Sequence, residues 1–253
     1  MRLVIITQDE PFYLASNIEY LLDNLPDFVL IDSFFLLKHS PTVGQKRSFL
    51  KIFSIIYTFG FSFFFHYCLK YINTLIFGKS LKKTLKKNNI SFKSIVSNIN
   101  SEEHLAYLRD NEIDLVISIL GSQIFKKPFI GTPKLGVINL HTSLLPKYRG
   151  VMPTFWVLKN KEKYTGVSVF FVNEGIDSGK IIVQKKILIG GMSQSELIKR
   201  TKRIGVELIL ESLIRINKGN FILLENEDPK STYYGFPTRN DVIEFKKAGA
   251  KFY

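Results

Sequence analysis

Residues 114–120 (DLVISIL) and residues 136–140 (GVINL) are two short apolar runs, each bounded by turn residues. Strands buried on both faces have this composition, because helices cover both surfaces of a parallel sheet. Similar runs occur at 3–7 (LVIIT), 28–36 (FVLIDSFFL) and 93–97, and helical patterns lie between them. Strands that alternate with helices predict an α/β fold with a Rossmann-like, mostly parallel sheet and helices on both faces.

The pattern changes after Pro153. Residues 165–173 (TGVSVFFVN) and 180–189 (KIIVQKKILI) alternate more regularly and predict an antiparallel or mixed pair of strands. Ser193 and Glu196 have the spacing of a capping box, which predicts the start of a helix of about 20 residues.

These patterns predict one large domain over residues 1–190, with a helical insertion over about 46–90. A short mixed α/β part over 191–253 is expected to follow it, beginning with the helix after Ser193. The 253 residues fit this arrangement, and 45% hydrophobic residues can fill a sizeable core.

The charged residues and the single cysteine narrow the classes of function. A net charge of +13, with lysines crowded between Lys79 and Lys87, favours an anionic partner or a basic, well-solvated surface. No RNP-type aromatic sequence or Cys/His zinc finger is present, so we expect no nucleic-acid partner. Cys68 alone excludes an intrachain disulfide. The opening MRLVIITQDEPFYL lacks a signal-peptide core, which predicts a cytoplasmic protein.

The most apolar stretch is residues 49–70, FLKIFSIIYTFGFSFFFHYCLK. As one helix it would be about 33 Å long, enough to cross a bilayer. A crossing would, however, separate strands that a parallel sheet needs together. A narrow polar stripe at helical spacing, with apolar residues around it, predicts packing on the sheet, a second helix, a second subunit or a membrane surface. The stripe consists of Lys51, Ser54, Thr58, Ser62, His66 and Lys70.

Asn139 and His141 lie two residues apart at the end of a predicted strand, so their side chains share a face. The carboxyl ends of strands are where open α/β sheets bind ligands. Asp177 follows in a glycine-flanked loop, EGIDSGK. An amide, an imidazole and a carboxylate suit acyl transfer to an amine, since the first two can stabilise an oxyanion and the third can orient the imidazole. Each residue also has a plainer structural explanation, as a hydrogen-bonding histidine, a turn cap or a loop acid.

The spacing N-x-H-x-SLLPKYRG, then P-x-x-W, G-V-x-V and G-I-D-x-G-x-I-x-x-Q, resembles the 10-formyltetrahydrofolate-dependent formyltransferase family over residues 136–184. Thr142 departs from the pattern, because many relatives have proline there. The resemblance implies that Asn139, His141 and Asp177 are catalytic and that 10-formyltetrahydrofolate is the formyl donor, with no metal. It also implies a folate site at Leu120, Gly121, Ser122, Gln123, Ile124, Gly175 and Ile176.

Three acceptors compete within this family. Glycinamide ribonucleotide enzymes usually carry a glycine-rich phosphate loop after the first strand, where this chain reads TQDEPFY. Methionyl-tRNA enzymes carry a C-terminal barrel, for which the residues after Asp177 are too few. The QDEPFY opening and the YYGFPTRNDVIEF tail resemble sugar-nucleotide N-formyltransferases, which implies a nucleotide-linked 4-amino-4,6-dideoxysugar used for surface polysaccharide such as lipopolysaccharide O-antigen.

That resemblance implies a set of acceptor-binding residues and a homodimer. The set is Gln8, Asp9, Tyr13, Ser143, Lys147, Arg149, Tyr233 and Tyr234. The aromatic residues of the tail, including Phe236, can equally pack in the core. A non-catalytic binding or membrane-surface protein on the same scaffold is the alternative outside enzymology.

Overall fold

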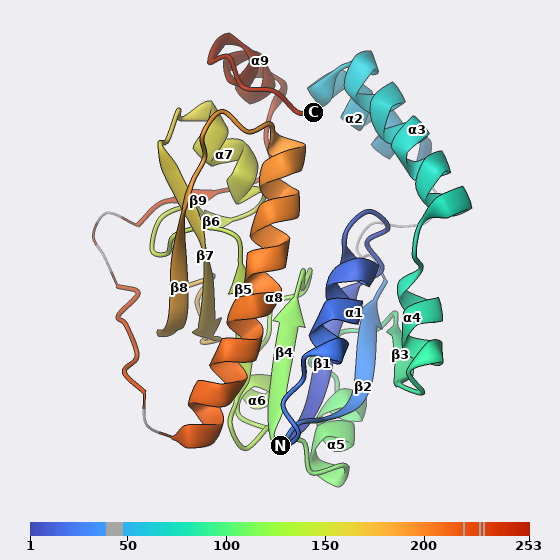
Figure 1. Cartoon of the computed structure of the whole chain (residues 1–253), viewed down its shortest axis with the longest axis vertical. Coiled ribbons are helices and arrows are strands. Elements are labelled where there is room, and N and C mark those ends of the chain that lie inside the picture. The colour runs from blue at the N-terminus through green and yellow to red at the C-terminus, as the bar shows by residue number, and fades with distance from the viewer. Residues whose placement is uncertain (39–47, 220, 228, 230) are drawn as a thin grey trace.

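A seven-stranded sheet runs through the computed structural model, which describes residues 1–38, 48–219, 221–227, 229 and 231–253 (Figure 1). The strand order is β3-β2-β1-β4-β5-β7-β8. The strands are β1 (Arg2–Gln8), β2 (Leu30–Leu37), β3 (Ser91–Ile95), β4 (Leu115–Ile119), β5 (Val137–His141), β7 (Tyr164–Phe171) and β8 (Ile181–Leu188). The first five are mutually parallel, whereas β7 is antiparallel to both β5 and β8. The predicted α/β class and mostly parallel sheet are therefore confirmed.

Helices cover both faces of the sheet and enclose two separate cores. On one face α1 (Leu14–Asp23), α4 (Leu81–Lys87) and α8 (Gln194–Lys218) pack on the sheet with residues such as Ile18, Leu85 and Leu213. On the other face α5 (Glu102–Asp110) and α6 (Lys127–Ile130) contribute Leu108 and Phe129. The even-numbered and odd-numbered residues of β5 consequently face different cores, Ile138 the first and Val137 the second.

The C-terminal residues return to the body of the molecule. The capping box of Ser193 and Glu196 begins α8, as predicted, although that helix has 25 residues rather than about 20. The short strand β9 (Tyr233–Tyr234) pairs with β6 (Arg149–Gly150), and α9 (Arg239–Lys247) packs near α7 (Pro153–Lys159). The expected domain boundary at residue 190 stays a prediction.

The expected single helix over 49–70 is wrong, because the segment forms two helices. α2 (Ser48–Phe59) and α3 (Phe61–Phe77) meet at Gly60, whose φ of 93° interrupts the helical path. Figure 1 shows this hairpin set apart from the sheet and beside α9. None of the helices in the described ranges is both long and apolar enough to cross a membrane. The expected start of the insertion, residues 46 and 47, lies outside the described residues.

Candidate active site

His141 is buried at the end of β5, and both of its ring nitrogens face protein oxygens. Nε2 lies 2.7 Å from the backbone oxygen of Tyr148. Because a carbonyl oxygen can only accept, Nε2 carries the proton of this bond. Nδ1 is then the nitrogen that can take up a proton, and it faces Oδ2 of Asp177 at 3.6 Å. The structure thus brings these two predicted residues together.

Asp177 belongs to the loop between β7 and β8 and has a φ of 48°, in the left-handed region that Asp and Asn tolerate better than most residues. Its Oδ2 also accepts a hydrogen bond from the backbone N–H of Gly150, at 2.8 Å. A Cβ atom at Gly179 would lie 1.7 Å from the backbone oxygen of Phe171. The close return of the loop to β7 therefore requires glycine at 179, which is the glycine that the EGIDSGK pattern supplies.

Asn226 holds this loop, and the sequence analysis missed it. Its amide nitrogen donates to the backbone oxygens of Asp177, at 2.8 Å, and Gly179, at 2.9 Å. Arg149 in turn donates to the backbone and side-chain oxygens of Asn226. Asn226 lies 49 residues after Asp177 in a segment without helix or strand, so no periodicity points to it.

Asn139 lies on β5 with its side chain on the same face as that of His141, and its amide has no hydrogen-bond partner within the described part of the chain. Ser118 is its neighbour in the register of β4 and β5. The hydroxyl of Ser118 is buried and also lacks a partner among the described residues. A Cβ atom at Gly121 would lie 2.6 Å from that hydroxyl, so glycine lets the next loop pass over it. Two unpaired polar groups thus adjoin the His141–Asp177 pair.

The expected folate residues after β4 divide into two groups. Gln123 is structural, because its side chain accepts from the N–H of Ile99 at 2.8 Å and donates to the backbone oxygen of Ser97 at 3.1 Å. Gly121, Ser122 and Ile124 are exposed, and Leu120 has a positive φ of 60°. In the second expected segment, Gly175 and Ile176 are exposed. The exposed residues of both loops leave backbone groups open to a ligand.

The expected acceptor residues do not form one cluster. Gln8 donates to the backbone oxygen of Leu120 at 2.9 Å, Asp9 pairs with Lys82 at 3.8 Å, and the Tyr13 hydroxyl contacts Ser195 at 2.8 Å. Three others lie in or next to the loop after β5: Ser143 is buried and donates to the backbone oxygen of Lys147, Lys147 is exposed, and Arg149 binds Asn226. Tyr233 is exposed, whereas Tyr234 stacks between Tyr148 and Trp156. Core packing thus accounts for Tyr234.

The Glu10 carboxylate binds the turn that precedes α1. Oε1 and Oε2 of Glu10 accept hydrogen bonds from the backbone N–H groups of Phe12 and Tyr13, at 2.9 and 3.1 Å. Lys202 on α8 pairs with the same carboxylate at 2.9 Å. These hydrogen bonds and the ion pair fix the turn that precedes α1.

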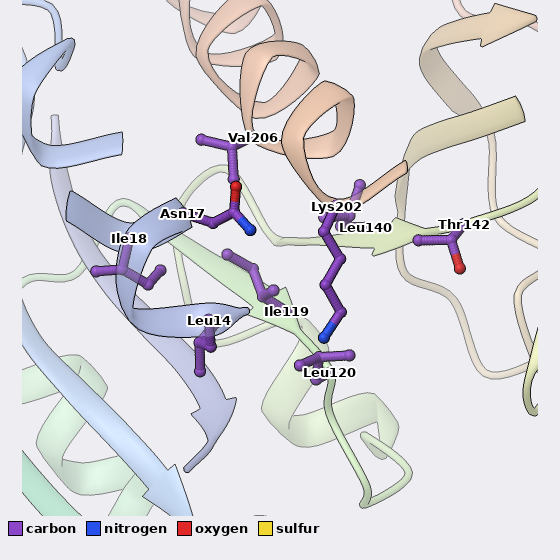
Figure 2. A pocket seen from close by; sticks show the side chains of 9 residues that line it. All are labelled: Leu14, Asn17, Ile18, Ile119, Leu120, Leu140, Thr142, Lys202 and Val206. Carbon is purple, nitrogen blue, oxygen red and sulfur yellow. The ribbon is translucent and has the colours of Figure 1, made fainter. Parts of the chain in front are cut away.

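Two hollows are candidates for ligand binding. The first is a small apolar cavity of about 30 Å³ between α1, α8 and the ends of β4 and β5, with Asn17, Thr142 and Lys202 among its lining residues. Figure 2 shows Lys202 reaching from α8 toward Leu120. The second is an open, polar hollow of about 360 Å³, next to Asp177 in the chain. Its lining residues in the described part are Arg149, Asn173, Ser178, Glu227, Pro229 and Ser231. Pockets that bind small ligands have volumes of about 300 Å³ or more, so the second hollow is in this range.

A protein-family model described as "Formyl transferase" matches residues 77–213, more than half of the chain and the part that contains Asn139, His141 and Asp177. A curated methionyl-tRNA formyltransferase from Synechococcus sp. (strain JA-2-3B'a(2-13)) is 36% identical over 130 residues, which cover 51% of this chain and 40% of that protein. The chain spans about half the length of the curated relatives it matches.

Solved structures under 25% identical share the fold. The N-formyltransferase from Helicobacter canadensis, in complex with folinic acid and dTDP-3-aminofucose, has 20% identity and a TM-score of 0.57, over 92% of this chain and 70% of that chain. A phosphoribosylglycinamide formyltransferase from Anaplasma phagocytophilum has 16% identity and a TM-score of 0.63, over 93% and 98% of the two chains. The matched family model covers more than half of the chain and shows that the chain belongs to the formyl transferase family.

Proposed function

We propose that the chain transfers a formyl group from 10-formyltetrahydrofolate to the amino group of a nucleotide-linked amino sugar. The observation that carries the proposal is the placement of an unpaired amide, Asn139, beside the His141–Asp177 pair at the carboxyl end of β5. Attack of an amine on a formyl carbon requires a hydrogen-bond donor for the oxyanion and a base for the amine proton. Asn139 and the His141–Asp177 pair are suited to these two tasks.

In this mechanism the residues have separate tasks. The amine of the acceptor attacks the formyl carbon, and the side-chain N–H of Asn139 donates to the oxygen that becomes negative. Nδ1 of His141 takes the proton that leaves the amine, and Asp177 stabilises the resulting imidazolium. Tyr148 fixes the ring through its backbone oxygen and Nε2. When the C–N bond to the folate breaks, His141 passes the same proton to the folate nitrogen.

The residues present fit a folate. The buried Ser118 hydroxyl has no partner in the described part of the chain, and an unsatisfied buried group calls for a ligand or water. The half-buried Asn139 amide beside it is open to the same ligand. Gly121, Ser122, Ile124, Gly175 and Ile176 would hold the folate through backbone groups of the two exposed loops. The folate supplies the formyl group, and we propose no metal.

For the acceptor, the residues around one hollow support a sugar nucleotide. The open hollow beside Asp177 includes Arg149, a residue suited to phosphate oxygens, and Tyr233 is exposed next to Arg149 in the β6–β9 pair and can stack on a base.

Methionyl-tRNA is the second candidate, because the curated relatives at 32–42% identity carry that name. The net charge of +13 also suits an RNA acceptor. The +13 charge by itself does not identify the acceptor, because both acceptors are anionic.

The test is a turnover assay with purified protein, 10-formyltetrahydrofolate and a panel of amines. The panel contains dTDP- and UDP-linked 3-amino and 4-amino sugars, glycinamide ribonucleotide and methionyl-tRNA. We expect mass spectrometry to find one added formyl group on a nucleotide sugar, and none with the His141→Asn variant. Transfer to methionyl-tRNA alone would replace the proposed acceptor. No transfer to any amine, with folate binding retained, would favour a non-catalytic binding protein.

A further inference from the structure

The polar stripe of α3 faces the protein. The Ser62 hydroxyl lies 2.9 Å from that of Tyr253, and the His66 ring stacks on the Tyr253 ring with a centroid distance of 3.7 Å. Lys70 donates to the Tyr13 hydroxyl and lies 5.0 Å from the centroid of the Phe12 ring. The polar side chains of α3 are thus engaged in contacts with the rest of the protein.

The opposite face of α3 is apolar and exposed. α3, which the structure describes in full, has no buried residue. Its outward side chains recur at helical spacing, and each is more than half exposed: Phe61 68%, Phe65 53%, Leu69 52%, Ile72 51%, Leu75 66% and Ile76 66%. α2 adds Phe53, at 74%. A surface helix normally has the reverse arrangement, so this face is built for surroundings other than water.

The segment that contains this face is positively charged and has no acidic residue of its own. Two of its lysines pair with acids from other elements, Lys79 with Glu19 and Lys82 with Asp9. The sequence from Ser33 to Ser101 contains eleven lysines and arginines and no aspartate or glutamate. α4 follows α3 directly and exposes Lys83, Lys86 and Lys87, for which no ion pair occurs in the described part of the chain. Leu81 and Leu85 anchor α4 in the core, so its lysines are held at the surface in the helix that follows α3 in the chain.

This combination distinguishes between the candidate partners. In a twofold interface each patch meets its own copy, so lysines would face lysines with no acid from this segment between them. An anionic lipid surface offers hydrocarbon to the apolar face and negative headgroups to the lysines. The hairpin cannot act as a span, because neither of its helices, of 12 and 17 residues, meets the length and hydropathy of one.

We propose that the α2–α3 hairpin and the lysines of α4 bind the surface of an anionic lipid bilayer. The apolar face of α3 lies among the upper acyl chains, parallel to the membrane plane, and Lys83, Lys86 and Lys87 contact headgroup phosphates. Because Lys70 joins α3 to Tyr13, next to the end of β1, the carboxyl end of the sheet lies on the membrane side. Bilayer binding does not depend on which amine the protein formylates.

Cosedimentation of the whole protein with vesicles tests the proposal without substrates. We expect binding to an equimolar mixture of phosphatidylglycerol and phosphatidylcholine, and little binding to phosphatidylcholine alone. Phe65→Glu with Leu69→Glu, and separately Lys83→Glu with Lys86→Glu, should each weaken binding about tenfold or more. Circular dichroism checks that each variant stays folded. We expect this because the four substituted side chains are exposed.

Two controls change the same residue types elsewhere. Ile222, which is 83% exposed, becomes glutamate. Lys127 of α6 and Lys218 at the end of α8, both exposed, become glutamate together, and Figure 1 shows α6 away from α3. Each control should weaken vesicle binding only as much as the lower net positive charge of the whole protein does. Failure of the wild-type protein to bind the anionic vesicles, or equal binding by the Phe65/Leu69 and control variants, would overturn the proposal. The proposal would also be overturned if the wild-type protein were a dimer that did not bind lipid and that the Phe65/Leu69 change dissociated.

Discussion

Oδ2 of Asp177 lies 3.6 Å from Nδ1 of His141 and accepts a hydrogen bond from the N–H of Gly150 at 2.8 Å. Asp177→Asn keeps the side-chain shape and suits the positive φ of 48°, but it removes the charge that stabilises a protonated His141. We expect turnover to fall by about 10²–10³ with an unchanged melting temperature. Near-normal turnover would remove Asp177 from the mechanism.

His141→Asn removes the ring nitrogen that takes up the amine proton. The shorter amide also loses the hydrogen bond that Nε2 of His141 makes to the backbone oxygen of Tyr148 at 2.7 Å. Turnover should fall by about 10²–10³, whereas folate affinity, which depends on the two exposed loops, should change little. Single-turnover kinetics and a folate-binding titration check the two parts. A large loss of folate binding with a normal chemical rate would contradict this assignment.

Asn226→Asp tests the tie between the tail and the catalytic loop. The carboxylate has the same shape but cannot donate to the backbone oxygens of Asp177 and Gly179. We expect the free energy of unfolding to fall by about 1–3 kcal/mol, as when buried acceptors lose their donor. Turnover should fall as well, because the Asp177 carboxylate loses its fixed position. Urea unfolding of this variant showing wild-type stability would contradict the inferred role.

The contact between α7 and α9 should weaken in acid. Burial alone would raise the pKa of Asp241, but hydrogen bonds from Lys159 and Thr238 outweigh it and hold that pKa below its ordinary value. A depressed carboxyl pKa contributes stability above the unfolded pKa of about 3.9 and loses it as pH falls through the folded value. The stability difference between wild type and Asp241→Asn should therefore be constant near neutrality and shrink below about pH 4. Unfolding free energies at a series of pH values measure it, and a difference that grows in acid would refute the assignment.

Removal of divalent metal should leave activity unchanged. The described part of the chain contains no group of three or more His, Cys, Asp or Glu side chains that could bind a metal ion, and the proposed steps use only Asn139, His141 and Asp177. Turnover in the presence of a chelator checks the expectation. Loss of activity that a divalent ion restores would require a different mechanism.

Gly60, Asn226 and Ser118 show where sequence reasoning was wrong or incomplete. The apolar pattern predicted one helix over 49–70, but a glycine at φ 93° divides it. Asn226 and Ser118 carry no local signal, because a lone polar residue in an irregular segment or an apolar strand has many explanations. Each owes its importance to a neighbour in space. For Asn226 that neighbour is 49 residues away, and for Ser118 it is Asn139 on the adjacent strand.

The sequence by itself determined the parallel strands, the antiparallel or mixed pair after them and the capping box at Ser193. These follow from periodicity and from spacing within short segments, which depend on the local chain alone. Asn139, His141 and Asp177 were named through the resemblance to a family, because their spacing alone has plainer explanations. The tertiary structure decided that Asp177 reaches His141, that Lys202 of α8 reaches Glu10, and that the polar stripe of α3 turns toward Tyr13 and Tyr253. A helical pattern shows which side chains share a face, but only the packing of distant segments determines which face meets the protein and which remains exposed.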